Sequence, residues 1–256
     1  MCKKMPSLFV GHGSPMNAIE DNMYTEKWLE IADEIGRPKA ILSISAHWYT
    51  KGSRITDSPQ LKTIYDMYGF PKELYEVKYD VQGSPEFAQN TINLISKSVS
   101  VDNSWGCDHG TWSVLCRMYP NADIPVYQLS IDYSIENNEH FKIGQEIAAL
   151  RDKGVMIMGS GNIVHNLSRL NWNMNGGYSW ADEFDNYIKD KILLKEYNDI
   201  IQYKKAGESA DFAFTSPDHF IPLLYVLGAT KSDDELVVFN DSCTMGSLSM
   251  TSYLFK

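Results

Sequence analysis

A long run of apolar and small side chains, within KAILSISAH at 39–47, is the feature that most constrains the fold of this chain. A strand with one face in water alternates polar and apolar residues, so an unbroken run predicts a strand that is covered on both faces. Strands of this kind belong to parallel or mixed sheets with helices packed on each side. Further strands are predicted at 7–10, 124–132, about 155–161, 236–241 and 250–255.

Helical segments alternate with these strands. Thr25 is expected to cap a helix that ends at Gly36, and the segment 50–82 is expected to form an excursion of short strands and turns. Strands that alternate with helices predict an α/β fold: a single-domain layered sandwich with a central mixed, largely parallel sheet flanked by helices, spanning residues 1–256. The other helices are predicted at 84–97, 136–152, about 181–205 and 216–230, with a turn and a short helix within 105–120.

The charge and the apolar pattern oppose several kinds of partner. The chain carries a formal net charge of −10 and shows no stripe of Lys or Arg, which opposes nucleic-acid binding. No segment reaches the ~20 consecutive apolar residues of a membrane helix. The four cysteines form no CxxC pair and are expected to be reduced thiols. These features predict a cytoplasmic protein that binds neither nucleic acid nor membrane.

Five of the six histidines occupy strand ends, turns or helix starts, beside Gly, Ser or Asp. In α/β sheets the loops beyond the carboxyl ends of the strands converge on one crevice, where sites assemble. A single histidine in such a place is more often a packed core residue, but five of them favour a shared site. The five are His12, His47, His109, His165 and His219, whereas His140 lies within a predicted helix and is expected to be structural.

The chemistry of imidazole indicates what such a site does. Neutral imidazole is a good ligand for zinc or non-haem iron, and near its ordinary pKa it is also a general base at neutral pH. The glycine-rich segments GHGSP and GSGN match neither phosphate-binding loops nor the GxSxG order of serine hydrolases. The residues alone therefore predict a metal site with a catalytic base.

Six blocks of sequence, in order, carry a resemblance to a known family. They are VGHGSPMNAIEDN, SAHW, WGCDHGTWSVL, GSGNIVHNL, DHFIPLLYVLGA and GSLSMTSYLF, and they run from residue 10 almost to the C-terminus. Together they resemble the class III extradiol ring-cleavage dioxygenases, in particular the DOPA 4,5-dioxygenase-like branch. The resemblance implies one catalytic domain over residues 1–256.

The resemblance also implies a role for each of the five histidines. His12 and His47 match two metal ligands of the family, and His219 matches the third ligand position. His165 matches the acid/base residue and, in zinc-bound forms, lies close enough to the metal to be a fourth ligand. His109 matches a further active-site residue that contacts the substrate or dioxygen. The implied cofactor is one divalent metal per chain, with dioxygen as co-substrate.

Two departures from the family pattern leave the metal and one thiol open. The wider family has a glutamate at the third ligand position, where this chain has His219 beside Asp218. An all-histidine site suits Zn(II) as readily as Fe(II). Cys107 occupies a position where an apolar residue is expected, either as an oxidisable thiol or as a packing residue.

The implied function is the opening of the ring of a small catechol, such as L-DOPA, beside rather than between its two hydroxyls. Two alternatives stay open: a metal-binding protein on the same scaffold with a signalling or redox-linked role, and a zinc-dependent hydrolase. Some aromatic residues near the blocks either hold the flat substrate ring or belong to the core. They are Trp48, Tyr49, Trp112 and Phe220.

Overall fold

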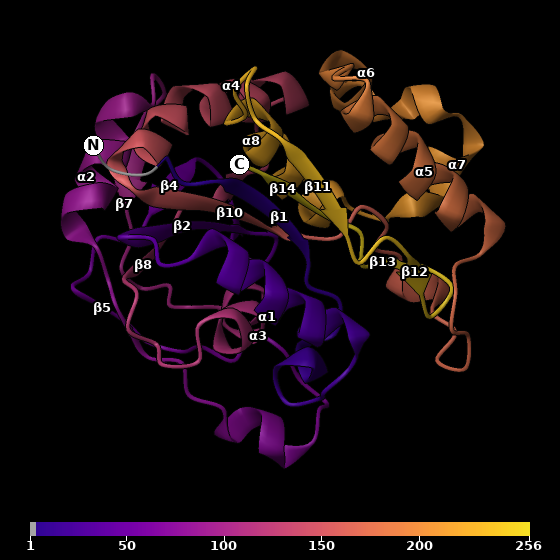
Figure 1. Ribbon diagram of the computed structural model, residues 1–256, viewed down its shortest axis with the longest axis horizontal. Coiled ribbons are helices and arrows are strands. Elements are labelled where there is room, and N and C mark those ends of the chain that lie inside the picture. The colour runs from indigo at the N-terminus through magenta and orange to yellow at the C-terminus, as the bar shows by residue number, and fades with distance from the viewer. Residues whose placement is uncertain (1–3) are drawn as a thin grey trace.

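A six-stranded sheet forms the centre of the computed structural model, which describes residues 4–256 (Figure 1). β1, β10, β2 and β8 run parallel, and β14 pairs antiparallel with both β1 and β11. The expected α/β fold with a mixed, largely parallel sheet is therefore confirmed. In spatial order the strands are β11 (Leu236–Phe239), β14 (Ser252–Phe255), β1 (Ser7–Gly11), β10 (Val155–Gly161), β2 (Ala40–Ser45) and β8 (Val126–Gln128).

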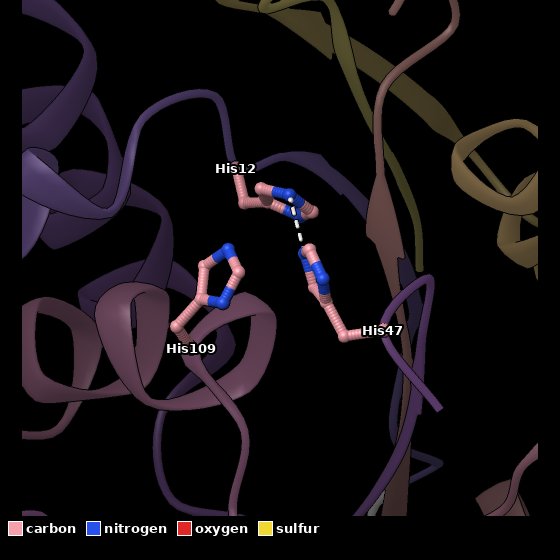
Figure 2. A group of neighbouring side chains, drawn as sticks. All are labelled: His12, His47 and His109. Carbon is pink, nitrogen blue, oxygen red and sulfur yellow. Dashed lines mark hydrogen bonds between the residues drawn. The ribbon is translucent and has the colours of Figure 1, made fainter. Parts of the chain in front are cut away.

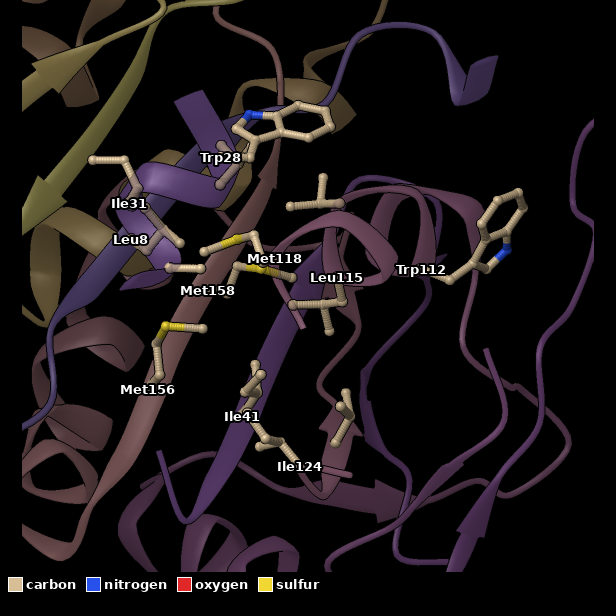
Figure 3. Packing of buried hydrophobic residues seen from close by; sticks show 14 of the residues in the cluster. Leu8, Trp28, Ile31, Ile41, Trp112, Leu115, Met118, Ile124, Met156 and Met158 are labelled. Atoms are coloured by element: carbon tan, nitrogen blue, oxygen red, sulfur yellow. The ribbon is translucent and has the colours of Figure 1, made fainter. Parts of the chain in front are cut away.

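Helices cover both faces of this sheet (Figure 1). On one face α1 (Met23–Ile35) and α3 (His109–Met118) pack against Met156 and Met158 of β10, as Figure 3 shows. On the other face α4 (Asn137–Ile147) and α8 (Ile221–Gly228) pack against the alternate residues of β10, Val155 and Ile157. Both faces of β10 are therefore buried, which explains its almost continuous apolar sequence.

The remaining elements are short or lie outside the central layers. The other helices are α2 (Pro85–Leu94), α5 (Ser179–Leu193), α6 (Tyr197–Ile201) and α7 (Glu208–Ala213), and the 3₁₀ helices are η1 (Pro15–Ala18), η2 (Lys72–Glu76), η3 (Ala148–Lys153), η4 (Leu167–Arg169), η5 (Tyr203–Ala206) and η6 (Pro217–His219). The short strands are β3 (Tyr49–Thr50), β4 (Ser53–Ile55), β5 (Gln60–Leu61), β6 (Val81–Gln82), β7 (Val99–Val101), β9 (Ile131–Asp132), β12 (Cys243–Thr244) and β13 (Leu248–Ser249). Within residues 4–256, no helix is both long and apolar enough to cross a bilayer.

The cap of the first helix and the continuity of the longest one differ from the sequence predictions. The cap of α1 is Asn22, whose side chain accepts from the backbone of Tyr24 and Thr25; Thr25 lies inside the helix and completes a capping box. The helix predicted at 181–205 is present but not continuous, because the chain leaves α5 after Leu193 and Lys195 takes a positive φ of 57°. That left-handed residue turns the chain into the separate helix α6.

A buried arginine connects several chain segments at the end of the sheet opposite the histidines. Arg151 is fully buried, and its guanidinium donates to the carbonyl oxygens of Met5, Ala229 and Phe255. It also forms two hydrogen bonds with the carboxylate of Asp234. Paired charge and satisfied donors make this burial tolerable, and the group joins segments from both ends of the chain.

Candidate metal centre

The five predicted site histidines come together beyond the carboxyl ends of the parallel strands. His12 follows β1 directly, His47 follows β2, and His165 lies beyond β10. His109 is the first residue of α3, and His219 is the last residue of η6. The site thus draws on segments far apart in sequence, as the parallel sheet dictates.

The imidazoles approach one another closely enough to bind a single metal ion. Figure 2 shows His12, His47 and His109, whose potential ligand nitrogens all lie within 4.8 Å of one another. The Nε2 atoms of His12 and His47 are 3.3 Å apart. The ring of His219 lies 5.2 Å from that of His12 and 5.0 Å from that of His47, centre to centre. His165 stacks on His219 with a centroid separation of 3.5 Å.

Three of these rings have their Nδ1 atoms held by oxygen, which fixes the tautomer. Ser160 donates its hydroxyl proton to the carbonyl of Gly110, so its oxygen must accept from His12 Nδ1 at 2.9 Å. The Nδ1 atoms of His109 and His219 likewise donate to carboxylates at 2.9 Å, those of Asp66 and Asp218. In each ring Nε2 is then left with its lone pair free to bind a cation.

The donor set fits a divalent metal. Two nitrogens bound to one tetrahedral ion at about 2.0–2.1 Å lie about 3.3 Å apart, which matches the Nε2 separation of His12 and His47. The Nε2 atom of His219 is buried and has no hydrogen-bond partner among residues 4–256. A buried polar atom without a partner is costly, and a metal ion would satisfy it.

The electrostatics keep these imidazoles neutral, which metal binding requires. Burial is the main cause of the lowered pKa of His12, His47, His165 and His219, and neighbouring imidazoles add to it in all four. The pKa values of His12 and His219 lie well below the ordinary range. Burial also lowers the pKa of His47 to about 3 and that of His165 to about 4. Each ring therefore carries a free lone pair at neutral pH.

Two aspartates that the sequence reading missed position the histidines. Asp66 accepts from both the backbone N–H and Nδ1 of His109 and faces His47 Nδ1 at 3.5 Å. Burial alone would raise the pKa of Asp66, but the two histidines outweigh it and lower that pKa. Asp108 caps α3 by accepting from Thr111 N. The CDHG sequence carries a capping signal for Asp108, whereas nothing local marks Asp66.

The histidines form the base of a cavity of about 540 Å³. The predicted aromatics Trp48, Tyr49, Trp112 and Phe220 do not line it: Trp48 stacks on Trp105, and Trp112 and Phe220 belong to the core. The apolar wall comes instead from two loops and the end of the β12–β13 hairpin. Its residues are Met67, Tyr68, Phe70, Leu167, Leu170, Trp172, Met245 and Leu248.

Cys107 and His140 lie outside the cavity lining. Cys107 is fully buried, and burial raises the pKa of its thiol well above the ordinary value, so the residue acts as packing. His140 lies in α4, where its Nδ1 is 2.9 Å from the hydroxyl of Tyr225.

A family comparison identifies the chemistry that this arrangement belongs to. Residues 6–256 match the family model described as the catalytic LigB subunit of aromatic ring-opening dioxygenase. The chain belongs to the LigB family. The six sequence blocks and the predicted resemblance to extradiol dioxygenases are thereby confirmed.

Relatives of this LigB-family chain carry the same class of activity in their names. It is 43% identical over 255 residues to the 4,5-DOPA dioxygenase extradiol of Escherichia coli K12, covering 97% of this chain and 94% of that one. The 4,5-DOPA dioxygenase extradiol of Beta vulgaris is 38% identical over 97% of this chain and 96% of its own.

A solved structure supports the fold assignment. The crystal structure of an uncharacterized protein from Escherichia coli K12 superposes with a TM-score of 0.85 at 39% identity, covering 98% of this chain and all of that one. With the family and the named relatives, this makes the chain an aromatic ring-cleaving oxidoreductase.

Proposed function

We propose that this LigB-family enzyme opens the ring of a small catechol, such as L-DOPA, in an extradiol reaction that uses one divalent metal and dioxygen. The observation that carries the proposal is the convergence of five imidazoles at the base of an open cavity of about 540 Å³. The names of the curated relatives support the catechol substrate.

His12, His47 and His219 are the proposed metal ligands. The Nε2 atoms of His12 and His47 lie 3.3 Å apart, and the ring of His219, whose buried Nε2 has no partner among residues 4–256, lies 5.0–5.2 Å from theirs, centre to centre. A bound Fe(II) would supply open coordination positions for the catechol oxygens and the electron that dioxygen chemistry requires. Zn(II) fits the same nitrogens but has no redox chemistry. Fe(II) is therefore the proposed active metal.

His165 is the proposed acid/base residue. It lines the cavity, and burial lowers its pKa, so its ring is neutral at neutral pH, as a residue that accepts a phenolic proton must be. Its parallel stacking on His219 holds the ring beside the proposed metal position. The same position of the His165 ring would also allow it to bind the metal.

His109 is the proposed contact to substrate or dioxygen. Asp66 fixes its Nδ1–H, so Nε2 presents a lone pair that can accept a hydrogen bond, or bind a proton and then donate it. The ring of His109 lies 3.8 Å from that of His47, centre to centre. This distance would also allow His109 to bind the same metal ion. Residues 1–256 are proposed to act as one catalytic unit.

A cytoplasmic location is also proposed. Cys107, Cys116 and Cys243 are free thiols, which suits a reducing compartment. Cys2 lies outside the described residues.

The test is reconstitution without air, using Fe(II) or Zn(II), followed by oxygen and a panel of catechols. Oxygen uptake and a coloured ring-opened product are expected only with Fe(II). His165→Gln should lower turnover while leaving the bound metal in place, and His140→Gln is the matched control because His140 lies outside the cavity. Full iron occupancy without oxygen uptake on any catechol would refute the proposed function.

A further inference from the structure

The described side chains that line the cavity leading to the histidines include no Lys or Arg. Among these described residues, Asp218 is the one carboxylate. Arg169 is close in sequence to the lining residues Leu167 and Leu170, but its guanidinium lies 4.6 Å over the ring of Phe212, which is not part of the lining.

This charge pattern disfavours a negatively charged substrate arm. With the proposed metal occupied by the catechol oxygens, a carboxylate on the ring substituent would find no Lys or Arg to pair with in the cavity lining and would meet the Asp218 carboxylate instead. The formal net charge of −10 on the chain adds a long-range repulsion. A ring substituent that is neutral, zwitterionic or cationic carries no net negative charge and so avoids both the unpaired burial and the long-range repulsion.

The mouth of the same cavity exposes large apolar side chains to water. Tyr68 is 92% exposed, Trp172 is 70% exposed and Leu167 is 60% exposed, and all three line the cavity. They come from two separate loops, after β5 and around η4. Scattered exposed apolar residues need no explanation, but three on one rim indicate a surface that an apolar ligand covers.

We propose, building on the catechol ring opening above, that the site selects catechols whose ring substituent carries no net negative charge, and that the apolar part of the substituent packs against Tyr68 and Trp172. L-DOPA satisfies the charge condition because its ammonium balances its carboxylate. A catechol with a propanoate arm does not. The selectivity therefore comes from the outer cavity, whereas the histidines recognise the catechol oxygens that all such substrates share.

The charge condition is tested with an isosteric pair: 3-(3,4-dihydroxyphenyl)propanoate and its carboxamide. The iron-loaded enzyme is expected to show a kcat/KM about tenfold or more higher for the carboxamide, and a correspondingly lower Kd when binding is measured without oxygen. Thr215→Lys, which adds a cation to the lining, should reduce that ratio at least about threefold. Equal constants for the two compounds, or a preference for the carboxylate, would overturn the proposal.

The apolar arm is tested with 4-propylcatechol and catechol. Trp172→Ala and Tyr68→Ala should each lower the ratio of their kcat/KM values at least about threefold, because the propyl group loses a packing surface. Tyr133→Ala is the matched control: Tyr133 is 51% exposed and lies outside the cavity lining, so the wild-type ratio should persist. A wild-type ratio in both cavity variants would overturn this part.

The two proposals fail in different ways. If no catechol is turned over by the iron-loaded enzyme, ring opening is refuted, and the Kd values measured without oxygen still decide the selectivity. If all catechols are turned over with equal efficiency, ring opening holds and the selectivity is refuted.

Discussion

Replacing Gly161 with alanine is expected to damage the proposed metal centre without touching any histidine side chain. Gly161 ends β10, and a Cβ built on it would lie 2.0 Å from the carbonyl oxygen of His219. Two backbone hydrogen bonds cross the same point: His12 N donates to the carbonyl of Gly161, and Asn162 N donates to that of His219. The end of β10 and two of the proposed ligands, His12 and His219, thus meet at Gly161.

The size of the effect follows from the overlap. Non-bonded heavy atoms are most favourable near 3.5 Å, so the 2.0 Å contact must open by roughly 1 Å or more. Backbone rather than a flexible side chain meets the new methyl group, so His219 or the end of β10 must move. A displacement of about 1 Å costs on the order of 100-fold in activity, and overpacking costs about 1–3 kcal/mol of stability.

The assay combines competition with a metal chelator, kcat/KM on a catechol and thermal unfolding of the metal-free chain. Gly176→Ala is the matched control, because a Cβ there meets nothing within 4 Å. Gly161→Ala should lose metal affinity and turnover, and Gly176→Ala should keep both. Wild-type metal affinity and wild-type unfolding temperature in Gly161→Ala would refute the steric argument.

Three further predictions address positioning, stability and pH. Asp66→Asn should weaken metal affinity or turnover by about 10–100-fold, because it removes the carboxylate that orients His109 and faces His47; unchanged affinity and turnover would contradict it. Arg151→Met should lower the free energy of unfolding by about 3–5 kcal/mol, measured with denaturant, since it removes the buried partner of Asp234 and leaves that carboxylate with Lys4 as its charged neighbour. Metal affinity should persist, and a loss below about 1 kcal/mol would contradict the prediction. The metal-free chain should lose stability as pH falls below about 6.5, because the folded-state pKa of His47 is lowered to about 3 and the unfolded chain takes up the proton first. Denaturant titrations with chelator at about pH 7.5 and about pH 5 check this, with a smaller drop expected for His47→Gln and a pH-independent midpoint as the contrary result.

The strands and the five histidines were predictable because their signals are local. The apolar run that ends at Ser45 marks a strand with two buried faces, and the residues just past it must lie at the sheet edge. The same reasoning applies to His12, which follows β1. The position of these histidines just past predicted strands was therefore enough to predict that their rings meet at one edge of the sheet.

The missed features depend on tertiary contacts. Asp66, Tyr68 and Trp172 lie in irregular segments, where neither period nor capping pattern fixes the position of a side chain. The break after α5 was missed for a related reason: Lys195 takes a left-handed conformation usually marked by glycine or asparagine, so its sequence gives no stop signal. The cap of α1 was misassigned by three residues because Asn22 and Thr25 are both good capping residues and form one box.

The position of β10 in the sheet also has a consequence for how the chain matures. β10 separates β1 from β2, and Ser7 pairs with Ile157, so the edge that carries His12 and His47 has no central strand until β10 has been synthesised. His165 and His219 emerge later still. In a nascent chain that ends before β10, β1 and β2 therefore lack the strand that lies between them in the folded sheet. We therefore expect the proposed metal to bind only after these distant parts of the sequence have come together.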